Sequence, residues 1–371
     1  MWSDHEKAAS DAIQLEYSYM RYNDVAIGDG DFDWSVVDEK LQEIATRGHQ
    51  AILRFHFVYP GKPSTVPAYI KQLPDYKETV AKSEGKPTGF VDWSHPAIGK
   101  FVLDFYSAFA KRYDKDPRLA YLQTGFGLWG EYHIYSGPRK IGETFPSKTY
   151  QTTFFQHMNR VFQQTPWMIS VDAADSDYSP LEDNDQLLGI RFGLFDDSFL
   201  CKPHPKENAL NWRVFGTDRW QHSPGGGEFS YYNKRDQKLS LSADGPNGQS
   251  FEDAAKAFHI TFMIGNDQPK YQSMDRIREA GMATGYRFQV TKFERSDSQT
   301  RVTIRNTGIA PMYHDAFVAI NGVRSTTSLR SLLPNDSQTF VIESSAKAPK
   351  LTIQSDRLLE GQEIPFAASL P

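Results

Sequence analysis

Residues 119–132 decide the fold and read Leu-Ala-Tyr-Leu-Gln-Thr-Gly-Phe-Gly-Leu-Trp-Gly-Glu-Tyr. An apolar run typical of a buried strand leads into a segment rich in glycine and ends on a carboxylate, Glu131, close to Trp129 and Tyr132. In a parallel barrel, polar residues at the carboxyl ends of strands belong to the functional face. The stretch therefore predicts both a buried parallel strand and a candidate site residue.

Strand-like and helix-like segments alternate on both sides of this stretch. The strands are expected at 15–21, at 51–57, in the run that begins at Leu119 and leads to Glu131, at 167–172, at 188–195, around Glu228 and at 259–265. The helices are expected at 34–47, 94–110, 152–164 and 252–258. Such alternation predicts an α/β fold with parallel pairing and right-handed crossovers.

The number of predicted strands bears on the architecture. A (β/α)8 TIM barrel needs one strand more than the seven segments found here, and we expect it in the first 14 residues or upstream of them. A doubly wound open sheet is the alternative. No G-x-G-x-x-G or Walker-type loop follows the first strand, which disfavours that alternative.

The sequence changes in character at about residue 286. Short strand-like runs at 288–293, 300–305, 316–320, 339–343 and 350–354 are separated by turns such as Asn306-Thr307-Gly308 and Asn321-Gly322. They predict a small all-β sandwich, similar in kind to an immunoglobulin domain. We therefore expect two domains, a barrel over residues 1–285 and a sandwich over residues 286–371.

Composition excludes several classes of protein. The net charge is −5 without a basic block, so nucleic acid is not an expected partner. The single cysteine, Cys201, rules out an internal disulfide framework, and no apolar run approaches the roughly 18 residues of a membrane span. Met1–Lys7 does not read as a signal peptide. We expect a cytoplasmic protein, or a periplasmic or secreted one if a signal peptide is missing from this sequence.

A second carboxylate follows further along the chain, where residues 225–232 read Gly-Gly-Gly-Glu-Phe-Ser-Tyr-Tyr. Glycoside hydrolysis needs two carboxyl groups, one that protonates the leaving oxygen and one that attacks the anomeric carbon or activates water. Glu131 and Glu228 are the candidates, and a solvated loop glutamate is the alternative for each. Trp129, Tyr132 and Trp220 are candidates for stacking on sugars, with a place in the core as the alternative.

Other polar residues interrupt apolar strands. Arg54 and His56 alternate along 51–57 and share one face, and Arg191 lies within the predicted strand 188–195. Because a buried charge needs a partner, we expect both arginines to bind substrate or hold a catalytic carboxylate, with an internal salt bridge as the alternative.

Aspartates at strand ends are a further source of site residues. Asp172 ends the strand 167–172 and is a candidate for substrate binding, with Asp175 close behind it. Asp196 and Asp197 offer another carboxylate, but neighbouring strand residues face opposite ways, so at most one points inward.

The sequence offers little for other chemistries. It contains no H-E-x-x-H, C-x-x-C or G-x-S-x-G motif, and its ten histidines show no metal-ligand spacing. We therefore predict no metal site. His133 follows Glu131 by two residues and could help to tune it.

Several motifs together resemble clan A glycoside hydrolases. They are Phe32-Asp33-Trp34 through Arg47-Gly48, the run Ala51-Ile52-Leu53-Arg54, and His95-Pro96 with the helix that precedes Gly-x-Trp-Gly-Glu. The resemblance implies a (β/α)8 barrel, Glu131 as the acid/base after strand four, Glu228 as the nucleophile after strand seven, a retaining mechanism and no cofactor. Members of this clan usually carry Asn-Glu at strand four, whereas this chain has Gly130 before Glu131.

More narrowly, the chain looks like a set of bacterial barrel proteins with a C-terminal β-sandwich. This likeness favours an oligosaccharide or polysaccharide substrate, such as a β-galactoside of an algal or plant polysaccharide. The expected function is thus a retaining glycoside hydrolase. A non-catalytic carbohydrate-binding or assembly protein on a barrel scaffold is the alternative, since a fold does not fix a function. The oligomeric state stays open.

Overall fold

The computed structural model describes residues 12–182, 184–344 and 348–367. The chain forms two compact units. The Glu131 unit comprises Leu15–Asp197 and Pro203–Thr217, and the Glu228 unit comprises Asp218–Pro371 with Ser198–Lys202 and Met1–Gln14. The expected domains, 1–285 and 286–371, stay a prediction, because these units divide the chain elsewhere.

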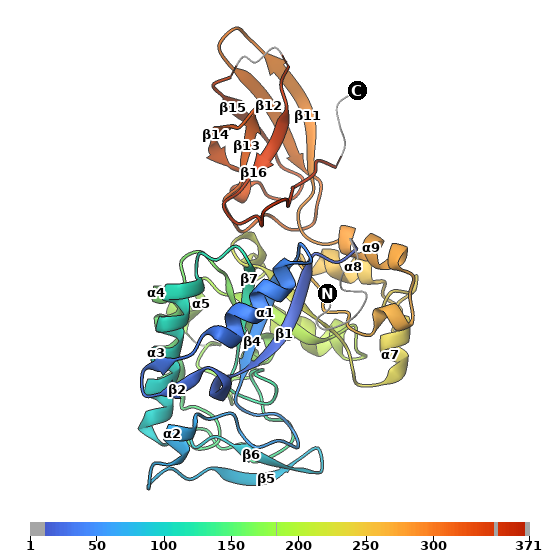
Figure 1. Ribbon diagram of the computed structural model, residues 1–371. Coiled ribbons are helices and arrows are strands. Elements are labelled where there is room, and N and C mark those ends of the chain that lie inside the picture. Colours follow the sequence, from blue (N-terminus) through green and yellow to red (C-terminus); the bar gives the residue numbers. More distant parts are fainter. Residues whose placement is uncertain (1–11, 183, 345–347, 368–371) are drawn as a thin grey trace. The chain divides into compact units, whose positions relative to one another are not determined.

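The main sheet contains six strands in the order β1-β4-β7-β8-β9-β10. Their bounds are β1 Leu15–Arg21, β4 Gln50–His56, β7 Leu119–Thr124, β8 Trp167–Ser170, β9 Gly193–Phe199 and β10 Gly225–Phe229. From β1 to β9 each strand pairs in parallel with the next (Figure 1). The predicted α/β class with a parallel sheet is therefore confirmed.

A further segment adds to this sheet in the Glu228 unit. Ile260 and Ile264 form parallel bridges with Gly225 and Glu228, which places the predicted strand 259–265 beside β10. The expected eighth strand falls largely on residues 1–11, which lie outside the described residues. Within the described part of the chain the sheet has no eighth strand, so closure into a full barrel stays a prediction.

Helices connect the parallel strands. Their bounds are α1 Ser35–Ala45, α2 Ala68–Lys71, α3 Pro96–Tyr113, α4 Lys148–Val161, α5 Asp185–Leu188, α6 Ala209–Val214, α7 Lys234–Leu239, α8 Phe251–Ala257 and α9 Met274–Met282. Shorter helical turns are η2 Tyr22–Asp24, η3 Val171–Ala174, η4 His204–Asn208, η5 Arg219–Gln221, η6 Gln268–Lys270 and η7 Leu329–Ser331. Among the described residues, none of the helices has the length and apolar character needed to cross a membrane.

Helix α3 shows why these segments fold as they do. Ile98, Phe101, Phe105 and Phe109 recur at helical spacing and are all buried, which gives the helix one continuous apolar face. This face packs on the sheet, where the rings of Phe105 and Phe55 lie 4.8 Å apart. His95 begins the helix as its cap, because its side chain accepts a hydrogen bond from the backbone N–H of Ala97.

Two short hairpins were not predicted. They pair β2 Ala26–Gly28 with β3 Asp31–Phe32, and β5 Thr79–Ser83 with β6 Lys86–Phe90. The second hairpin lies in a connection expected to be irregular. Most of β5 is exposed or half-buried and polar, so its sequence lacks the apolar alternation that marks a strand.

The predicted strand 188–195 was placed too early. Helix α5 ends at Leu188, and the strand β9 begins only at Gly193. Arg191 therefore lies before the strand and is exposed, and Asp196 and Asp197 lie within it. The apolar residues of 188–192 belong to a helix end and the turn that follows it.

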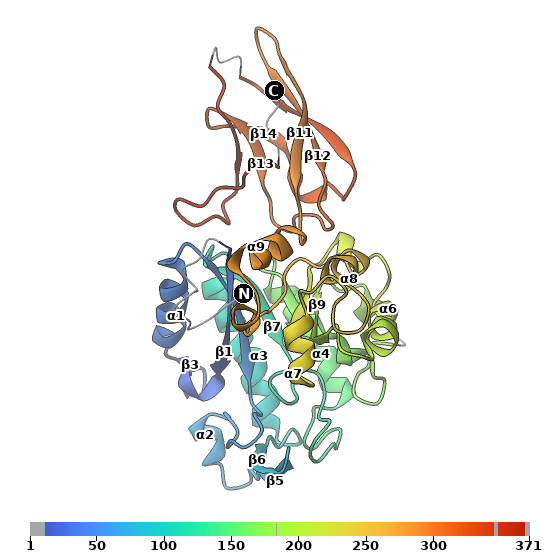
Figure 2. The same ribbon diagram turned by 90° about the vertical axis from the view of Figure 1, so that its right-hand side faces the viewer.

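The last part of the Glu228 unit is made of two antiparallel three-stranded sheets, β11-β12-β15 and β14-β13-β16 (Figure 2). Their bounds are β11 Phe288–Arg295, β12 Thr300–Asn306, β13 Phe317–Ile320, β14 Val323–Ser328, β15 Ser337–Ile342 and β16 Leu351–Gln354. Val302, Ile304, Val318 and Phe340 belong to one buried cluster, as in a sandwich. The prediction missed β14, in which only Ser325 is buried.

A buried carboxylate ties α1 to the sheet. Glu16 on β1 is fully buried and accepts hydrogen bonds from Arg47 Nε and Nη2, each at 2.7 Å, and its Oε1 lies 2.8 Å from His49 Nδ1. Burial alone would raise the pKa of Glu16, but the hydrogen bonds from His49 and Arg47 and the Arg47 charge outweigh it and lower this pKa. The carboxylate therefore stabilises the folded state at neutral pH.

We expect Glu16→Gln to lower the free energy of unfolding by about 2 kcal/mol, because Arg47 is only 21% exposed and loses its buried charged partner. Glu43→Gln is the matched control, because Glu43 also pairs with Arg47 but is 44% exposed, so its loss should cost at most about 0.5 kcal/mol.

The Glu16 contribution should also depend on pH. A lowered pKa means that the stabilisation is present above the ordinary value of 4.5 and is lost as the pH falls through the folded-state pKa. Urea denaturation at pH 7 and in acid should thus show that the free energies of unfolding of the wild type and Glu16→Gln become equal at low pH. An equal gap at both pH values would contradict this account.

Candidate active site

The loop after β7 folds back on itself and so places Glu131. Leu128 forms a parallel bridge with Val58, which continues the pairing of β7 with β4. The backbone N–H of Gly127 then donates to Glu131 O at 2.8 Å, and that of Leu128 donates to His133 O at 3.0 Å. These hydrogen bonds hold Glu131 and His133 at the carboxyl end of β7.

Gly130 makes this fold of the loop possible. Its φ is +71°, in the left-handed region, and a Cβ there would lie 2.8 Å from Phe55 O and 3.3 Å from the Arg54 side chain. Only glycine combines this conformation with such a close approach to another strand. The glycine before Glu131 thus has a local structural reason.

Arg54 is the centre of the polar cluster in the Glu131 unit. It lies on β4, opposite Gln123 of β7, and its side chain is 1% exposed. Its Nε and Nη2 donate to Gln123 Oε1 at 2.9 and 2.6 Å, and its Nη1 and Nη2 donate to the two Asp197 oxygens at 2.7 and 3.1 Å. The guanidinium charge therefore has a bidentate carboxylate partner.

Aromatic rings surround the same guanidinium. Its Cζ lies 4.2 Å from the centroid of Phe195, 5.2 Å from that of Tyr17 and 5.6 Å from that of Tyr19. Rings at these distances attract a cation through their electron-rich faces. Among the described residues, Asp197 and Glu131 are the carboxylates that lie within 4.0 Å of the Arg54 guanidinium.

Glu131 lies beside this ion pair but farther from the guanidinium than Asp197 does. Its Oε1 is 3.8 Å from Arg54 Nη1, against 2.7 Å for Asp197. Burial raises the pKa of Glu131 well above its usual range, and the Asp197 charge and a hydrogen bond with Asp197 raise it further, while Arg54 opposes them. The site therefore favours the protonated form of Glu131.

Asp196 and Asp197 face opposite ways, as predicted for neighbours on a strand. Asp197 contacts Arg54, whereas Asp196 accepts two hydrogen bonds from Asn208 Nδ2 at 2.9 and 3.0 Å and lies 3.2 Å from His204 Nδ1. The two side chains thus show the opposite orientations expected of neighbours on a strand, and one of them contacts Arg54. Asp197 is that residue.

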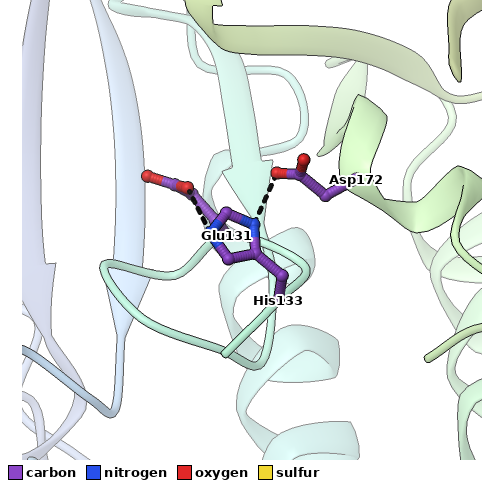
Figure 3. Close-up of side chains that lie close together, drawn as sticks. All are labelled: Glu131, His133 and Asp172. Atoms are coloured by element: carbon purple, nitrogen blue, oxygen red, sulfur yellow. Dashed lines mark hydrogen bonds and ion pairs between the residues drawn. The ribbon is translucent and has the colours of Figure 1, made fainter. Parts of the chain in front are cut away.

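His133 lies between two carboxylates (Figure 3). Its Nδ1 is 2.7 Å from Asp172 Oδ2, and its Nε2 is 3.7 Å from Glu131 Oε2. Burial lowers the pKa of His133, but the charge and hydrogen bond of Asp172 outweigh this and raise it. Burial likewise raises the pKa of Asp172, but His133 and the hydrogen bond from Ser170 lower it overall. The two side chains thus favour an ion pair.

Glu131, His133 and Asp172 are also close enough together to be considered as metal ligands. However, Asp172 takes the Nδ1 side of the imidazole, so only Glu131 faces Nε2. An ion between them would also meet the Arg54 guanidinium, 3.8 Å from Glu131. This donor set and the nearby positive charge favour a proton over a metal ion.

Two further predicted binding residues lie near Arg54 or Glu131. His56 is buried, and its Nδ1 has no hydrogen-bond partner among the described residues. Burial and the charges of Arg21 and Arg54 lower the pKa of His56 to about 4, so its imidazole is neutral at pH 7. Trp129 is half-buried and stacks on Tyr135, which is 58% exposed. Their roles in binding stay predictions.

The expected sugar contacts of Tyr132, Arg191 and Trp220 do not fit their places in the structure. Tyr132 is fully buried, packs against Phe126 and Phe145 in the core, and donates from its hydroxyl to Gln151. Arg191 precedes β9 and is exposed, so its predicted place within the strand is wrong.

Trp220 lies in the Glu228 unit, where His259 covers one face of its indole ring. The two ring centroids are 3.6 Å apart and nearly parallel, at 9°. The backbone oxygen of Trp220 accepts a hydrogen bond from the Tyr313 hydroxyl at 2.6 Å. These contacts indicate a packing role within the unit.

Glu228 lies in strand β10, not in a surface turn, and is half-buried. One of the glycines before it has a structural reason, since a Cβ on Gly226 would lie 2.3 Å from the Phe262 ring. Glu131 and Glu228 belong to different units. The separation of about 5–5.5 Å that a retaining mechanism requires of such a catalytic pair therefore stays a prediction.

Sequence reasoning missed Gln123 and gave Asp197 only as an alternative. Gln123 is a fully buried polar residue in the otherwise apolar strand β7, in register with Arg54. A single amide within an apolar run was the available signal, because it needs a buried partner.

No protein-family model matches this chain, and no curated protein matches it. Among solved structures, the galactosidase domain of the α-galactosidase–sucrose kinase AgaSK aligns with a TM-score of 0.42 and 11% identity, over 91% of this chain and 51% of that chain. The GH36 α-galactosidase AgaA from Geobacillus stearothermophilus gives 0.43 and 10%, over 91% and 52%.

A β-galactosidase from the psychrophilic Marinomonas ef1 also aligns, with a TM-score of 0.43 and 11% identity, over 76% of this chain and 57% of that chain. The chain thus spans about half the length of the solved structures that it matches. At such low identities and TM-scores, the chemistry of the site has to be argued from its own residues.

The loop of Glu131 yields a prediction of stability. Gly130→Ala should lower the free energy of unfolding by about 3 kcal/mol, because a left-handed conformation disfavours alanine and the new methyl group meets Phe55 O. Gly142→Ala is the matched control, since Gly142 has φ +85° but a methyl group added to it would meet no atom within 4 Å, and about 1 kcal/mol is expected. Chemical denaturation measures both, and equal losses would refute the close approach at Gly130.

Proposed function

We propose that this protein is a glycoside hydrolase in which Glu131 is the general acid/base and Asp197 is the ionised carboxylate. The observation that supports this proposal is the unequal environment of two neighbouring carboxyl groups. Asp197 is held by the Arg54 guanidinium, whereas burial and the Asp197 charge raise the pKa of Glu131. Two carboxyl groups driven into different protonation states are what acid and nucleophile require.

The proposed reaction has two steps. Asp197 attacks the anomeric carbon, the glycosidic C–O bond breaks, and the proton of Glu131 passes to the leaving oxygen. Water then attacks the glycosyl ester, its proton returns to Glu131, and Asp197 leaves as a carboxylate. Each cycle consumes one water and restores both groups. Arg54 stays hydrogen-bonded to Asp197 in both steps.

The spacing of the two groups supports retention over inversion. Inverting enzymes hold their carboxyl groups about 6.5–9.5 Å apart to admit a water, and retaining enzymes about 5–5.5 Å. Glu131 Oε1 and Asp197 Oδ2 approach the same atom, Arg54 Nη1, at 3.8 and 2.7 Å, so the two groups lie side by side in the free site. We infer that they act at the shorter, retaining distance once a sugar is bound.

The proposal keeps two finer points from the sequence. Glu228 is the alternative nucleophile, as the clan A resemblance implies. A β-galactoside of an algal or plant polysaccharide is the proposed substrate class, with Trp129 and His56 among the binding residues. We propose that the parallel sheet belongs to a (β/α)8 barrel, which collects such groups at the carboxyl ends of its strands.

The acid role of Glu131 predicts a dependence on the leaving group. Glu131→Gln should slow hydrolysis of unactivated glycosides by about 10²–10⁴-fold, because their leaving oxygen needs a proton. Aryl glycosides with good leaving groups should lose far less. Steady-state rates across a series of aryl glycosides measure this, and an equal loss for every leaving group would exclude the acid role.

The nucleophile can be identified by chemical rescue. Asp197→Ala should abolish turnover, and azide should partly restore it by taking the place of the missing carboxylate. Asp196→Asn is the matched control, since this neighbouring residue faces away from Arg54 and its loss should leave kcat within about twofold. Rescue of Glu228→Ala in place of Asp197→Ala would transfer the role to Glu228.

The binding alternative predicts a different pattern. A carbohydrate-binding protein would retain oligosaccharides, measured by calorimetry, with equal affinity in the wild type and Glu131→Gln, and would cleave none of them. A screen of aryl α- and β-glycosides together with algal oligosaccharides separates the two functions and identifies the sugar.

A further inference from the structure

The imidazole of His133 has one nitrogen engaged and one aimed at Glu131 (Figure 3). We propose that His133, held by Asp172, is a positioning residue whose imidazolium stabilises the carboxylate that Glu131 becomes after giving up its proton. This inference rests on the proposed function. It adds a residue that a scheme of two carboxyl groups does not contain.

The orientation of His133 is fixed from two sides. The Ser170 hydroxyl donates to Asp172 Oδ2 at 2.5 Å, and this same oxygen lies 2.7 Å from His133 Nδ1. The backbone oxygen of His133 accepts from the Leu128 N–H at 3.0 Å. With Nδ1 and the backbone both held, Nε2 is directed towards Glu131, 3.7 Å away. A small movement would bring the two atoms into hydrogen-bond distance.

The charges around His133 favour its protonated form. Asp172 faces it from η3, Asp197 acts on it from β9, Asp175 lies just beyond η3, and Glu131 comes from its own loop. The cation near Glu131 is Arg54, which sits 2.7 Å from Asp197 but 3.8 Å from Glu131. The new charge on Glu131 therefore needs a second cation, and His133 supplies it.

The timing of this need follows from the reaction. While Glu131 holds its proton, an imidazolium at 3.7 Å costs little, because a neutral acid does not repel it. Once the proton has moved to the leaving oxygen, the same imidazolium faces a carboxylate. The interaction is thus stronger after proton transfer than before it, which is the condition for accelerating that step.

The test uses His133→Gln, which keeps a hydrogen-bond donor of similar reach but removes the charge. Without a positive charge beside it, Glu131 keeps its proton to higher pH, so the basic limb of the pH profile of kcat should move up by about one unit. For a poor leaving group kcat should fall about tenfold, whereas KM should change less than twofold. A merely structural role would leave the limb in place.

Two further variants complete the comparison. Asp172→Asn removes the charge that favours the imidazolium, but this charge also raises the pKa of Glu131, so the basic limb should move less than in His133→Gln, and the variant is used to follow the titration of His133 itself. Asp177→Asn is the matched control, because Asp177 is exposed on the same segment and pairs with Arg139 at 3.4 Å. It should leave the profile unchanged. An unshifted limb in His133→Gln would overturn the proposal, and if that variant does not fold, a titration of His133 that is unchanged in Asp172→Asn would do so.

A measurement without substrate separates this inference from the proposed function. Nuclear magnetic resonance of the imidazole nitrogens in the full chain should show that the pKa of His133 lies above its ordinary value of 6.5. This pKa should be lower in Asp172→Asn than in the wild type. A neutral His133 at pH 6.5 in the wild type would overturn the proposal even if glycosides are cleaved. If no glycoside is cleaved, the proposed function fails, whatever the titration shows.

Discussion

The structure of the Glu131 unit depends on one buried cation. Removing a guanidinium from water costs several kcal/mol unless charge and hydrogen bonds compensate. Arg54 is 1% exposed, so the strands around it have to supply that compensation. Gln123 from β7 and Asp197 from β9 do so, and the rings of Tyr17 and Phe195 close the remaining sides. The strands β4, β7 and β9 are thereby joined through the Arg54 side chain.

The same constraint separates the two carboxyl groups. Arg54 can neutralise one carboxylate fully, and its bidentate contact goes to Asp197. Glu131 is left in a buried place next to a negative charge, where the protonated form is favoured. The glycine loop after β7 fixes where Glu131 can lie. Both its closeness to Asp197 and its raised pKa therefore follow from the path of the backbone. The division of roles is therefore built into the fold.

Much of this arrangement could be predicted from the sequence. Glu131 and Arg54 were predicted because each is a charged residue in or directly after an apolar strand. A charge in such a place needs a buried partner or a role in the site. Asp197 could not be chosen over Asp196, since the choice depends on where β9 begins. The run 188–195 looked like one strand, whereas α5 ends at Leu188 and β9 begins at Gly193. A shift of this size changes which side chain faces inward.

Other differences have similarly local causes. Trp129 and Tyr132 look alike in the sequence, but the turn at Gly130 sends Tyr132 into the core and leaves Trp129 half-buried. The strands β5 and β14 carry mostly polar and exposed residues, so periodicity did not mark them. Long apolar strands and helices were predictable because burial on both sides selects their residues strongly.

The central claim is that burial and the neighbouring Asp197 charge together favour the protonated form of Glu131. The most direct test is a titration of the Glu131 carboxyl carbon by nuclear magnetic resonance, with the signal assigned by its absence in Glu131→Gln. The account predicts that the pKa of Glu131 lies well above its ordinary value of 4.5 and falls in Asp197→Asn, which removes the neighbouring negative charge. A Glu131 that titrates near 4.5 in the wild type, or whose pKa is unchanged by Asp197→Asn, would contradict it.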